Sequence, residues 1–255
     1  MKPWLLKGAV SVCLGMAALL SPSGSQAADV AFVADMTQTG PQGVISTGKL
    51  YVSGQKRRVE VSRDGDSLVS ITDGERGMVT TLFPSQKAYT EQAAAVSAKS
   101  AADFDPCAAM SGAECRKLGQ ELIGDRKTDK WEIRYQQQGM SLTSYQWIDR
   151  ERRIPLRHEM PGGQRSELRF LSKEKLNGRE VEKWRMISSQ ANKAPLITHQ
   201  WYDPELRQAV KQELPGGYTS ELTNIQVGSV GDALFIAPPD YRKMAMPIAV
   251  GYSDK

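Results

Sequence analysis

The chain has 255 residues, of which 24% are charged and 40% hydrophobic, and its formal net charge is +4 at pH 7. No stripe of lysine and arginine interleaved with aromatic residues occurs, so a nucleic acid is not an expected partner. The common metal-binding and phosphate-binding motifs do not occur either, and we expect no metal and no cofactor.

The first 27 residues have the three parts of a secretory signal. Two lysines and no acid precede an apolar run at 8–20, and small residues lead up to Ala27. The run is shorter than the roughly 20 apolar residues that span a membrane. We therefore predict a signal peptide cleaved after Ala27, a periplasmic location, and no transmembrane segment in the mature chain 28–255. Processing as a lipoprotein at Cys13 is a less favoured alternative.

Short runs of β-forming residues, separated by glycine and aspartate turns, follow this leader. In one of them Val59 and Val61 alternate with polar and charged neighbours. Such alternation, together with Asp-Gly pairs at 64–65 and 73–74, is typical of an antiparallel meander with tight hairpins. We predict strands at 30–38, 44–53, 56–63, 67–72 and 78–83.

An alanine-rich segment interrupts the strands. Gln92–Asp103 lacks runs of β-branched residues and stops before a proline, which predicts a helix. Ala113–Leu122 is predicted to form a second, shorter helix. Cys107 lies between the two and Cys115 lies within the second, and an even number of cysteines in an exported chain predicts a disulfide. We therefore expect a helical, disulfide-stapled insert at about 92–122.

Two segments of the second half repeat each other. Residues 146–168 read QWIDRERRIPLRHEMPGGQRSEL, and residues 200–222 read QWYDPELRQAVKQELPGGYTSEL. One supersecondary unit therefore occurs twice, in repeats at about 124–171 and 178–225. No more than two clear copies are found, which is too few for a solenoid. We predict that they are adjacent segments of one curved sheet within a single domain, 28–255.

Several motifs together resemble a known family. The segments GKLYVSGQKRRVEV and KAYTE, the repeated WID and WYD strands, and the ending GDALFIAPPDYRKM are similar to periplasmic proteins with the LolA/LolB-type fold of lipoprotein carriers. They look nearest to an uncharacterised branch with a domain of unknown function. The resemblance implies a mainly β (α+β) fold: a strongly curved antiparallel sheet forming an incomplete barrel, with a short helical insert as plug or lid. It also implies a concave cavity for acyl chains or lipidated proteins.

Aromatic residues of the repeats are the candidates for lining such a cavity. Tyr145 and Trp147 share one face of their strand, as His199 and Trp201 do, and the residues between them are polar. We expect these strands to bury the tryptophan face and to expose the other, which carries Ser144, Gln146, Thr198 and Gln200. Core and rim packing is the alternative role of the aromatic residues. The predicted ligand-binding residues are Trp131, Tyr145, Trp147, Trp184, Trp201, Val59, Val61 and Phe83.

Patterns that indicate catalysis are weak. His158 and His199 have no histidine at the equivalent position of the other repeat, and no G-x-S-x-G motif occurs. Glutamates are duplicated at 159 and 213 and at 167 and 221, and such carboxylate pairs can act in acid–base catalysis. Because arginine or lysine flanks them, we predict cross-strand ion pairs instead. We therefore expect no catalytic residue and no enzymatic activity.

The sequence thus favours a periplasmic, non-enzymatic protein that binds a hydrophobic ligand as a carrier or sensor. The ligand would be a lipid, an acyl chain or a lipidated protein, held in a dry pocket of several hundred Å³. The alternative is a scaffold or interaction module of the cell envelope, with a filled core, an exposed apolar patch and an envelope protein as partner. A hydrolase is the least favoured alternative.

Overall fold

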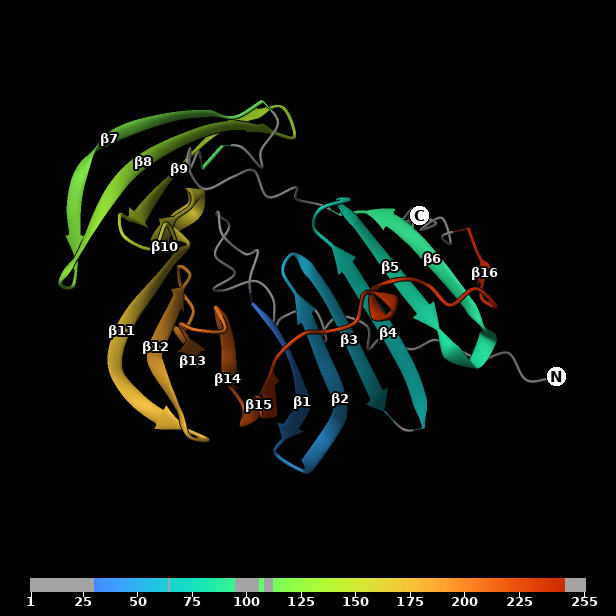
Figure 1. Cartoon of the computed structure of the whole chain (residues 1–255). Helices are drawn as coiled ribbons and strands as arrows, with labels where there is room; N and C mark the ends of the chain where they lie inside the picture. Colours follow the sequence, from blue (N-terminus) through green and yellow to red (C-terminus); the bar gives the residue numbers. More distant parts are fainter. Residues whose placement is uncertain (1–29, 64, 95–105, 108–111, 246–255) are drawn as a thin grey trace. The chain divides into compact units, whose positions relative to one another are not determined.

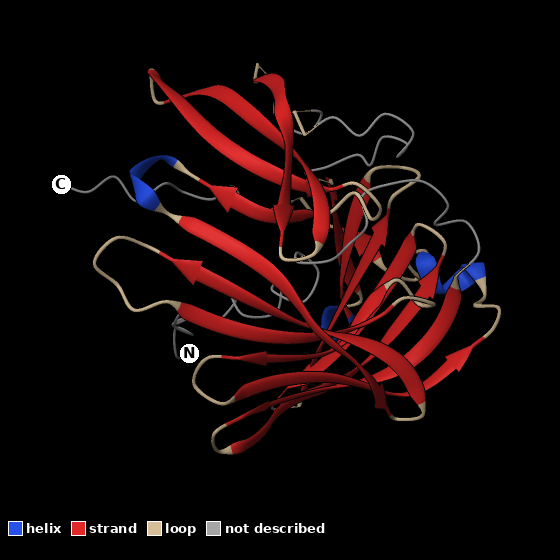
Figure 2. Cartoon of the chain, turned by 90° about the vertical axis from the view of Figure 1, so that its left-hand side faces the viewer, coloured by secondary structure: helices blue, strands red, loops and turns tan. Residues whose placement is uncertain are grey.

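Residues 30–63, 65–94, 106–107 and 112–245 are described by the computed structural model. Strands dominate, and the helical elements of this part of the chain are short 3-10 turns (Figure 2). The predicted mainly β fold is therefore confirmed. The predicted signal peptide lies outside the described residues, and so does most of the predicted helix Gln92–Asp103.

The chain divides into two compact units, and each contains a sheet of bent strands (Figure 1). We call Arg116–Pro215 the middle unit, and Gly24–Cys115 together with Gly216–Lys255 the terminal unit. Within each unit the strand order of the described residues does not return to its first strand, so neither sheet closes into a barrel. This open, curved, antiparallel arrangement agrees with the prediction. The single domain 28–255 stays a prediction.

The middle unit is a meander in which each strand pairs with the next one along the chain. All of the strand pairs recorded within it are antiparallel. The 3-10 turn η4 (Pro161–Gly163) forms the predicted Pro-Gly-Gly reversal, with Gly162 at φ 81° and Gly163 at φ 76°. Glycine adopts this left-handed conformation without steric cost. The strands are β7 (Glu114–Ile123, which begins just before the unit), β8 (Arg126–Gln137), β9 (Met140–Asp149), β10 (Pro155–Glu159), β11 (Arg165–Leu176), β12 (Arg179–Ser189), β13 (Leu196–Asp203) and β14 (Gln208–Leu214).

The terminal unit has the strand order β16-β6-β5-β4-β3-β2-β1-β15. Its strands are β1 (Ala31–Gly40), β2 (Gly43–Ser53), β3 (Lys56–Arg63), β4 (Asp66–Asp73), β5 (Met78–Phe83), β6 (Ala88–Ala93), β15 (Tyr218–Val227) and β16 (Arg242–Lys243). The short 3-10 turns η2 (Pro84–Gln86) and η5 (Asp232–Phe235) complete it. The five strands predicted in this half are confirmed, with small shifts at their ends, because turn residues mark each boundary.

Each unit has its own apolar core. In the middle unit Trp184 packs edge-to-face against Phe170, with ring centroids 5.5 Å apart. The buried residues clustered with Trp184 are Ile123, Trp147, Ile154, Leu156 and Leu168. In the terminal unit Phe235 of η5 packs against the buried residues Val69, Ile71 and Leu82. The segment after β15 therefore covers one face of β4 and β5.

Residues Ala113–Leu122, predicted as a helix, instead belong largely to β7. Thr128 Oγ1 on β8 donates a hydrogen bond to the backbone carbonyl of Glu121 (2.8 Å). Gly124, at φ 63°, lets the chain reverse between the two strands. Pairing with β8 thus outweighs the modest helix propensity of the segment. The predicted helical insert at 92–122 is therefore wrong over its second half.

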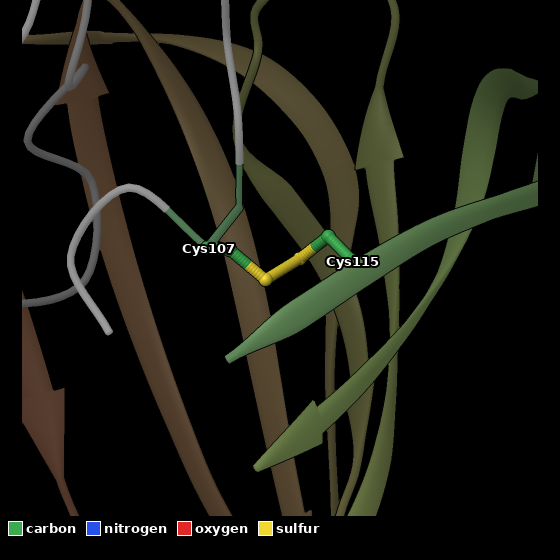
Figure 3. Close-up of a disulfide and its surroundings, with 2 residues drawn as sticks. All are labelled: Cys107 and Cys115. Carbon is green, nitrogen blue, oxygen red and sulfur yellow. A yellow bond between two sulfur atoms is a disulfide. The ribbon is translucent and has the colours of Figure 1, made fainter. Parts of the chain in front are cut away.

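The predicted disulfide is confirmed. Cys107 and Cys115 are bonded, with their Cα atoms 5.9 Å apart, and Cys115 lies near the start of β7 (Figure 3). The bond therefore ties Cys107 to the start of β7.

We expect reduction of this disulfide to lower the free energy of unfolding by about 2–3 kcal/mol, because the link removes conformational entropy from the unfolded chain. Urea denaturation with and without reductant measures the difference. The double variant Cys107→Ser/Cys115→Ser should have the same free energy of unfolding as the reduced protein, and reductant should not change it. Equal stability of the oxidised and reduced proteins would contradict the expectation.

The two copies of the repeat use the same turn after their Trp-x-Asp strands. Asp149 Oδ1 accepts hydrogen bonds from the backbone N–H groups of Glu151 (2.9 Å) and Arg152 (2.8 Å). Asp203 makes the equivalent bonds to residues 205 and 206. Both aspartates are buried, and an arginine from the neighbouring strand pairs with each carboxylate. The duplicated aspartates therefore have a structural role as acceptors within a turn.

A third copy of this turn occurs in the terminal unit. Asp73 Oδ1 accepts a hydrogen bond from the backbone N–H of Arg76 (3.0 Å). Gly77 (φ 61°) takes the left-handed position that Arg153 (φ 58°) and Arg207 (φ 52°) hold in the other two copies. The sequence repeat itself does not extend to this turn, which keeps the Asp-x-Glu pattern but has neither the tryptophan nor the Pro-Gly-Gly.

Candidate functional site

The repeated tryptophans Trp147 and Trp201 have the same hydrogen-bonded surroundings. The indole Nε1 of Trp147 donates to Glu121 Oε2 (2.6 Å), and that of Trp201 donates to Glu174 Oε2 (2.9 Å). Hydrogen bonds from Trp147 and then Lys130 lower the pKa of Glu121, because they stabilise its charged form. Each glutamate is therefore ionised at neutral pH and fixes the orientation of one indole.

Cationic side chains lie over both indole rings. Lys130 Nζ lies 4.7 Å from the ring centroid of Trp147, and the guanidinium of Arg157 lies 5.2 Å from it. Lys183 and Lys211 lie 4.7 Å and 4.6 Å from the ring of Trp201. Such cation–π contacts are favourable, and both indoles are buried. These protein contacts account for the duplicated tryptophans, while their role in ligand binding stays a prediction.

The other predicted ligand-binding residues are divided between the two units. Trp184 has an exposed fraction of 0% and donates from Nε1 to Glu182 (3.2 Å). Tyr145 packs against the core cluster that contains Trp147 and Trp184, and Trp131 is half-buried. The remaining predicted residues are half-buried positions of the terminal unit: Val59, Val61 and Phe83. The structure thus brings together the aromatic residues of β9 and β12.

The prediction that β9 and β13 bury only their tryptophan face was wrong. Ser144 and Gln200, on the opposite face, have exposed fractions of 3% and 4%. Ser144 lies opposite Ile133 on β8, and Gln200 lies opposite Trp184 on β12. Large apolar neighbours on the adjacent strands therefore cover these shorter polar side chains, and both faces are buried at the centre of the strands.

An apolar pocket of about 130 Å³ lies on β9 to β12, mainly on the face opposite that of Trp147, although Arg157 and Glu167 of the Trp147 face also line it. Strand pairing places Gln146 opposite His158 and His158 opposite Ser166, so the three polar side chains form one row. Leu168 and Met186, which are also paired, follow in the next row. The lining residues are Gln146, Pro155, Leu156, Arg157, His158, Ser166, Glu167, Leu168 and Met186.

The polar groups of this pocket can receive a ligand. Among the described residues no hydrogen bond joins the side chains of Gln146, His158 or Ser166 to another protein group. Burial lowers the pKa of His158, so its imidazole is neutral at pH 7 and offers one donor and one acceptor. Apolar walls with a few convergent polar groups are typical of a small-molecule site.

A second pocket, the hairpin pocket, lies beside the turn between β10 and β11 and has a volume of about 380 Å³. The turn is closed by a hydrogen bond from the N–H of Met160 to the carbonyl of Gln164 (2.8 Å). Tyr145 lines this pocket, and it is the one predicted ligand-binding residue in the two pockets described. The lining residues are Thr143, Tyr145, Glu159, Met160, Pro161, Gly163, Gln164 and Arg165.

Three arginines surround the buried carboxylate of Glu167. Arg157 Nε lies 2.8 Å and Arg169 Nε 2.5 Å from its oxygens, and Arg165 is also bonded to it. Burial alone would raise the pKa of Glu167, but the hydrogen bonds from Arg165 and Arg169 and the charge of Arg157 outweigh it and lower the pKa to about 2. The predicted cross-strand ion pair is confirmed for Glu167 with Arg157, whereas Glu213 pairs with Lys211 of its own strand (3.0 Å).

Sequence reasoning did not select the residues of the apolar pocket. His158 was interpreted as an ordinary strand residue, and neither Ser166 nor Met186 was predicted to bind a ligand. The hairpin itself carries the missing signal, because pairing symmetrically about the Pro-Gly-Gly turn places His158 opposite Ser166. Register counted from a recognised turn would have found the pair, whereas alternation along one strand could not.

Two further properties of the described residues concern possible sites. They contain no group of three or more histidine, cysteine, aspartate or glutamate side chains placed to hold a metal ion. None of the helices formed by these residues has the length and apolar character needed to cross a bilayer.

No protein-family model and no curated protein matches the chain. Among solved structures, a DUF1329 family protein from Desulfovibrio piger is 12% identical, with 82% of this chain and 90% of that chain covered and a TM-score of 0.37. A LolA superfamily protein from Nitrosomonas europaea is 13% identical, with 84% and 93% covered and a TM-score of 0.39. An outer membrane lipoprotein-sorting protein domain from Vibrio parahaemolyticus is 12% identical, with 84% and 91% covered and a TM-score of 0.36.

At these identities and TM-scores the similarity does not say what the chain binds, because one fold can carry many functions.

Proposed function

We propose that this chain is a periplasmic, non-enzymatic binding protein for a hydrophobic ligand, acting as a carrier or sensor. The ligand is a lipid, an acyl chain or a lipidated protein. The observation that supports the proposal is the apolar pocket of β9 to β12, whose walls are mainly Leu156, Leu168 and Met186. The periplasmic location rests on the predicted signal peptide.

The size of the pocket limits what part of a ligand can enter it. A cavity of about 150 Å³ lined by apolar side chains holds a molecule as large as benzene. A pocket of about 130 Å³ therefore admits a segment of an apolar chain, with the remainder of the ligand outside. The row of Gln146, His158 and Ser166 is placed to meet a polar group of the same ligand.

The same row supports binding more than catalysis. A serine nucleophile needs a hydrogen-bonded base that a third group orients. Among the described contacts, Ser166 makes no hydrogen bond to His158, and no carboxylate is bonded to this imidazole. We therefore propose no reaction at this pair.

The proposal is tested by filling the pocket. We expect Met186→Trp to weaken binding of a fluorescent fatty acid by about tenfold or more, because the larger side chain occupies the space of the ligand. Met140→Trp is the matched control, since Met140 is exposed and lines neither pocket. Fluorescence titration gives both affinities, and near-UV circular dichroism checks that each variant is folded.

Native mass spectrometry of protein purified from the periplasm provides an independent readout. A bound lipid that Met186→Trp loses and Met140→Trp retains would support the carrier or sensor. If neither the native protein nor the delipidated protein binds any hydrophobic molecule, the proposal fails and a scaffold with a filled core is the better account.

A further inference from the structure

We infer that the paired arginines Arg169 and Arg185 form a binding site for a phosphate group. The two residues lie directly opposite each other on β11 and β12. Directly opposed residues of an antiparallel pair have Cβ atoms about 4.5–5.5 Å apart, and like charges at such positions are destabilising. An anion bound between the two guanidinium groups would reduce the repulsion between them.

Arg185 is half-buried and has no recorded partner among the described residues. Its Nε is buried and makes no hydrogen bond among the described residues, and no ion pair is recorded for it there. A buried polar atom of a charged group costs free energy when it has no hydrogen-bond partner. The neighbour opposite it on β13 is His199, whose side chain is not an acid and offers no carboxylate. The missing partner of Arg185 is therefore an anion from outside the described structure.

The nearby carboxylates are already engaged. Glu167 is shared by three arginines, and Glu213, which lies opposite His199, pairs with Lys211. Arg169 donates a hydrogen bond from Nε to Glu167. The exposed fraction of its side chain is 53%. Its two terminal nitrogens make no recorded contact in the described part of the chain, so they can bind a ligand.

A phosphate group fits this arrangement better than a single carboxylate does. A guanidinium group presents its donors as a planar fork that matches phosphate oxygens. Two opposed forks can bind different oxygens of one tetrahedral phosphate and share its negative charge. His199, next in the row, adds a third side chain with hydrogen-bonding nitrogens.

The surface beside the arginines indicates how the phosphate could be carried. Ile187 and Ile197 lie opposite each other in the adjacent row on the same face, and Ile197 is exposed. A phosphate attached to an apolar group would contact arginines and isoleucines together, whereas free phosphate would contact the arginines alone. The shared chemistry is the phosphate, and the two sources are inorganic phosphate and the headgroup of a phospholipid.

The inference is independent of the proposed function. Leu168 and Met186, which line the apolar pocket, alternate with Arg169 and Arg185 along β11 and β12 and so lie on the opposite face. A protein that binds no fatty acid could still bind phosphate, and the converse also holds.

The experiment uses the full mature chain and two probes, inorganic phosphate and vesicles of phosphatidylcholine with or without phosphatidic acid. Isothermal titration calorimetry measures phosphate binding, and flotation measures vesicle binding. We expect Arg169→Gln and Arg185→Gln each to weaken binding by about tenfold or more, because each removes charge-assisted hydrogen bonds. Arg185→Lys should lose most of the affinity as well, since lysine lacks the fork.

Arg134→Gln is the matched control. Arg134 is an exposed arginine of β8 whose glutamate partner, Glu132, is also buried, and its loss should leave binding unchanged. Binding of inorganic phosphate that requires both Arg169 and Arg185 supports a site for free phosphate. If the protein binds vesicles that contain phosphatidic acid but not inorganic phosphate, and this binding requires both Arg169 and Arg185, a headgroup site is supported.

Thermal unfolding separates a binding defect from a folding defect. Phosphate, or soluble short-chain phosphatidic acid for a headgroup site, should raise the Tm of the wild type and of Arg134→Gln and leave the Tm of Arg169→Gln and Arg185→Gln unchanged. The inference is overturned if folded wild-type protein binds neither probe, or if Arg134→Gln weakens binding as much as Arg185→Gln does.

Discussion

Replacing Trp184 with alanine is expected to lower the free energy of unfolding by about 3–5 kcal/mol. The side chain is fully buried at the centre of the middle unit, against Phe170 and the apolar cluster around it. Removing it loses the transfer free energy of a large aromatic group and leaves a cavity that the strands of a paired sheet cannot readily close. Urea denaturation, with the m-value checked for two-state behaviour, measures the loss.

Trp131→Ala is the matched control for this experiment. Trp131 ends the segment GDRKTDKW that leads into the first repeat, as Trp184 ends NGREVEKW before the second. Because Trp131 is only half-buried, we expect a loss of about 1–2 kcal/mol. The same chemical change at two equivalent positions then reports on burial alone. Equal losses at the two positions would show that Trp184 is not the centre of this core.

Replacing Glu167 with glutamine is expected to destabilise the protein by about 1–3 kcal/mol at pH 7, because three arginines lose the carboxylate that they share. The loss should be smaller than for a fully buried pair, since Arg165 and Arg169 are partly exposed. Denaturation of the wild type and of Glu167→Gln at a series of pH values tests this prediction.

The stabilisation by Glu167 is expected to decrease as the pH falls. The pKa of Glu167 is about 2 in the folded protein, below its ordinary value of 4.5. Its contribution to stability is therefore fully present above about pH 4.5 and is lost as the pH falls from there to about 2. The two proteins should differ at pH 7 and converge near pH 2.

Glu159→Gln provides the control, since Glu159 has one long ion pair with Arg165 (3.8 Å) and is more exposed than Glu167. We expect a change of no more than about 0.5 kcal/mol. A constant gap between wild type and Glu167→Gln from pH 5 to pH 2 would contradict the assignment of the low pKa to this carboxylate.

Strands, turns and the disulfide could be predicted from the sequence because their signals are local. The strand Lys56–Arg63 alternates between apolar and polar residues, and glycine marks the Pro-Gly-Gly reversal. The ion pair of Arg157 with Glu167 could be predicted in kind, since unlike charges flank a recognised turn. In each case a few neighbouring residues determine the structure.

The elements that escaped prediction depend on partners far along the chain or on cross-strand register. β7 is a strand because β8 pairs with it, although its own residues indicate a helix as readily. Ser144 and Gln200 are buried because of the residues opposite them, Ile133 and Trp184. The apolar pocket and the pairing of Arg185 with Arg169 likewise arise from contacts between strands, which no single stretch of sequence shows.

The pairing of β1 with β15 has a consequence for the order in which the chain can fold. Within the middle unit each strand meets the next as soon as a short turn forms, so its contacts are local in sequence and form early. β1 is different on one side: it pairs with β2, but its other neighbour is β15, and the hydrogen bond from Asn224 to Asp35 spans 189 positions. The terminal unit therefore cannot be completed until the entire middle unit has been synthesised. During that interval β1 has an open edge, and such edges are prone to pair with other chains.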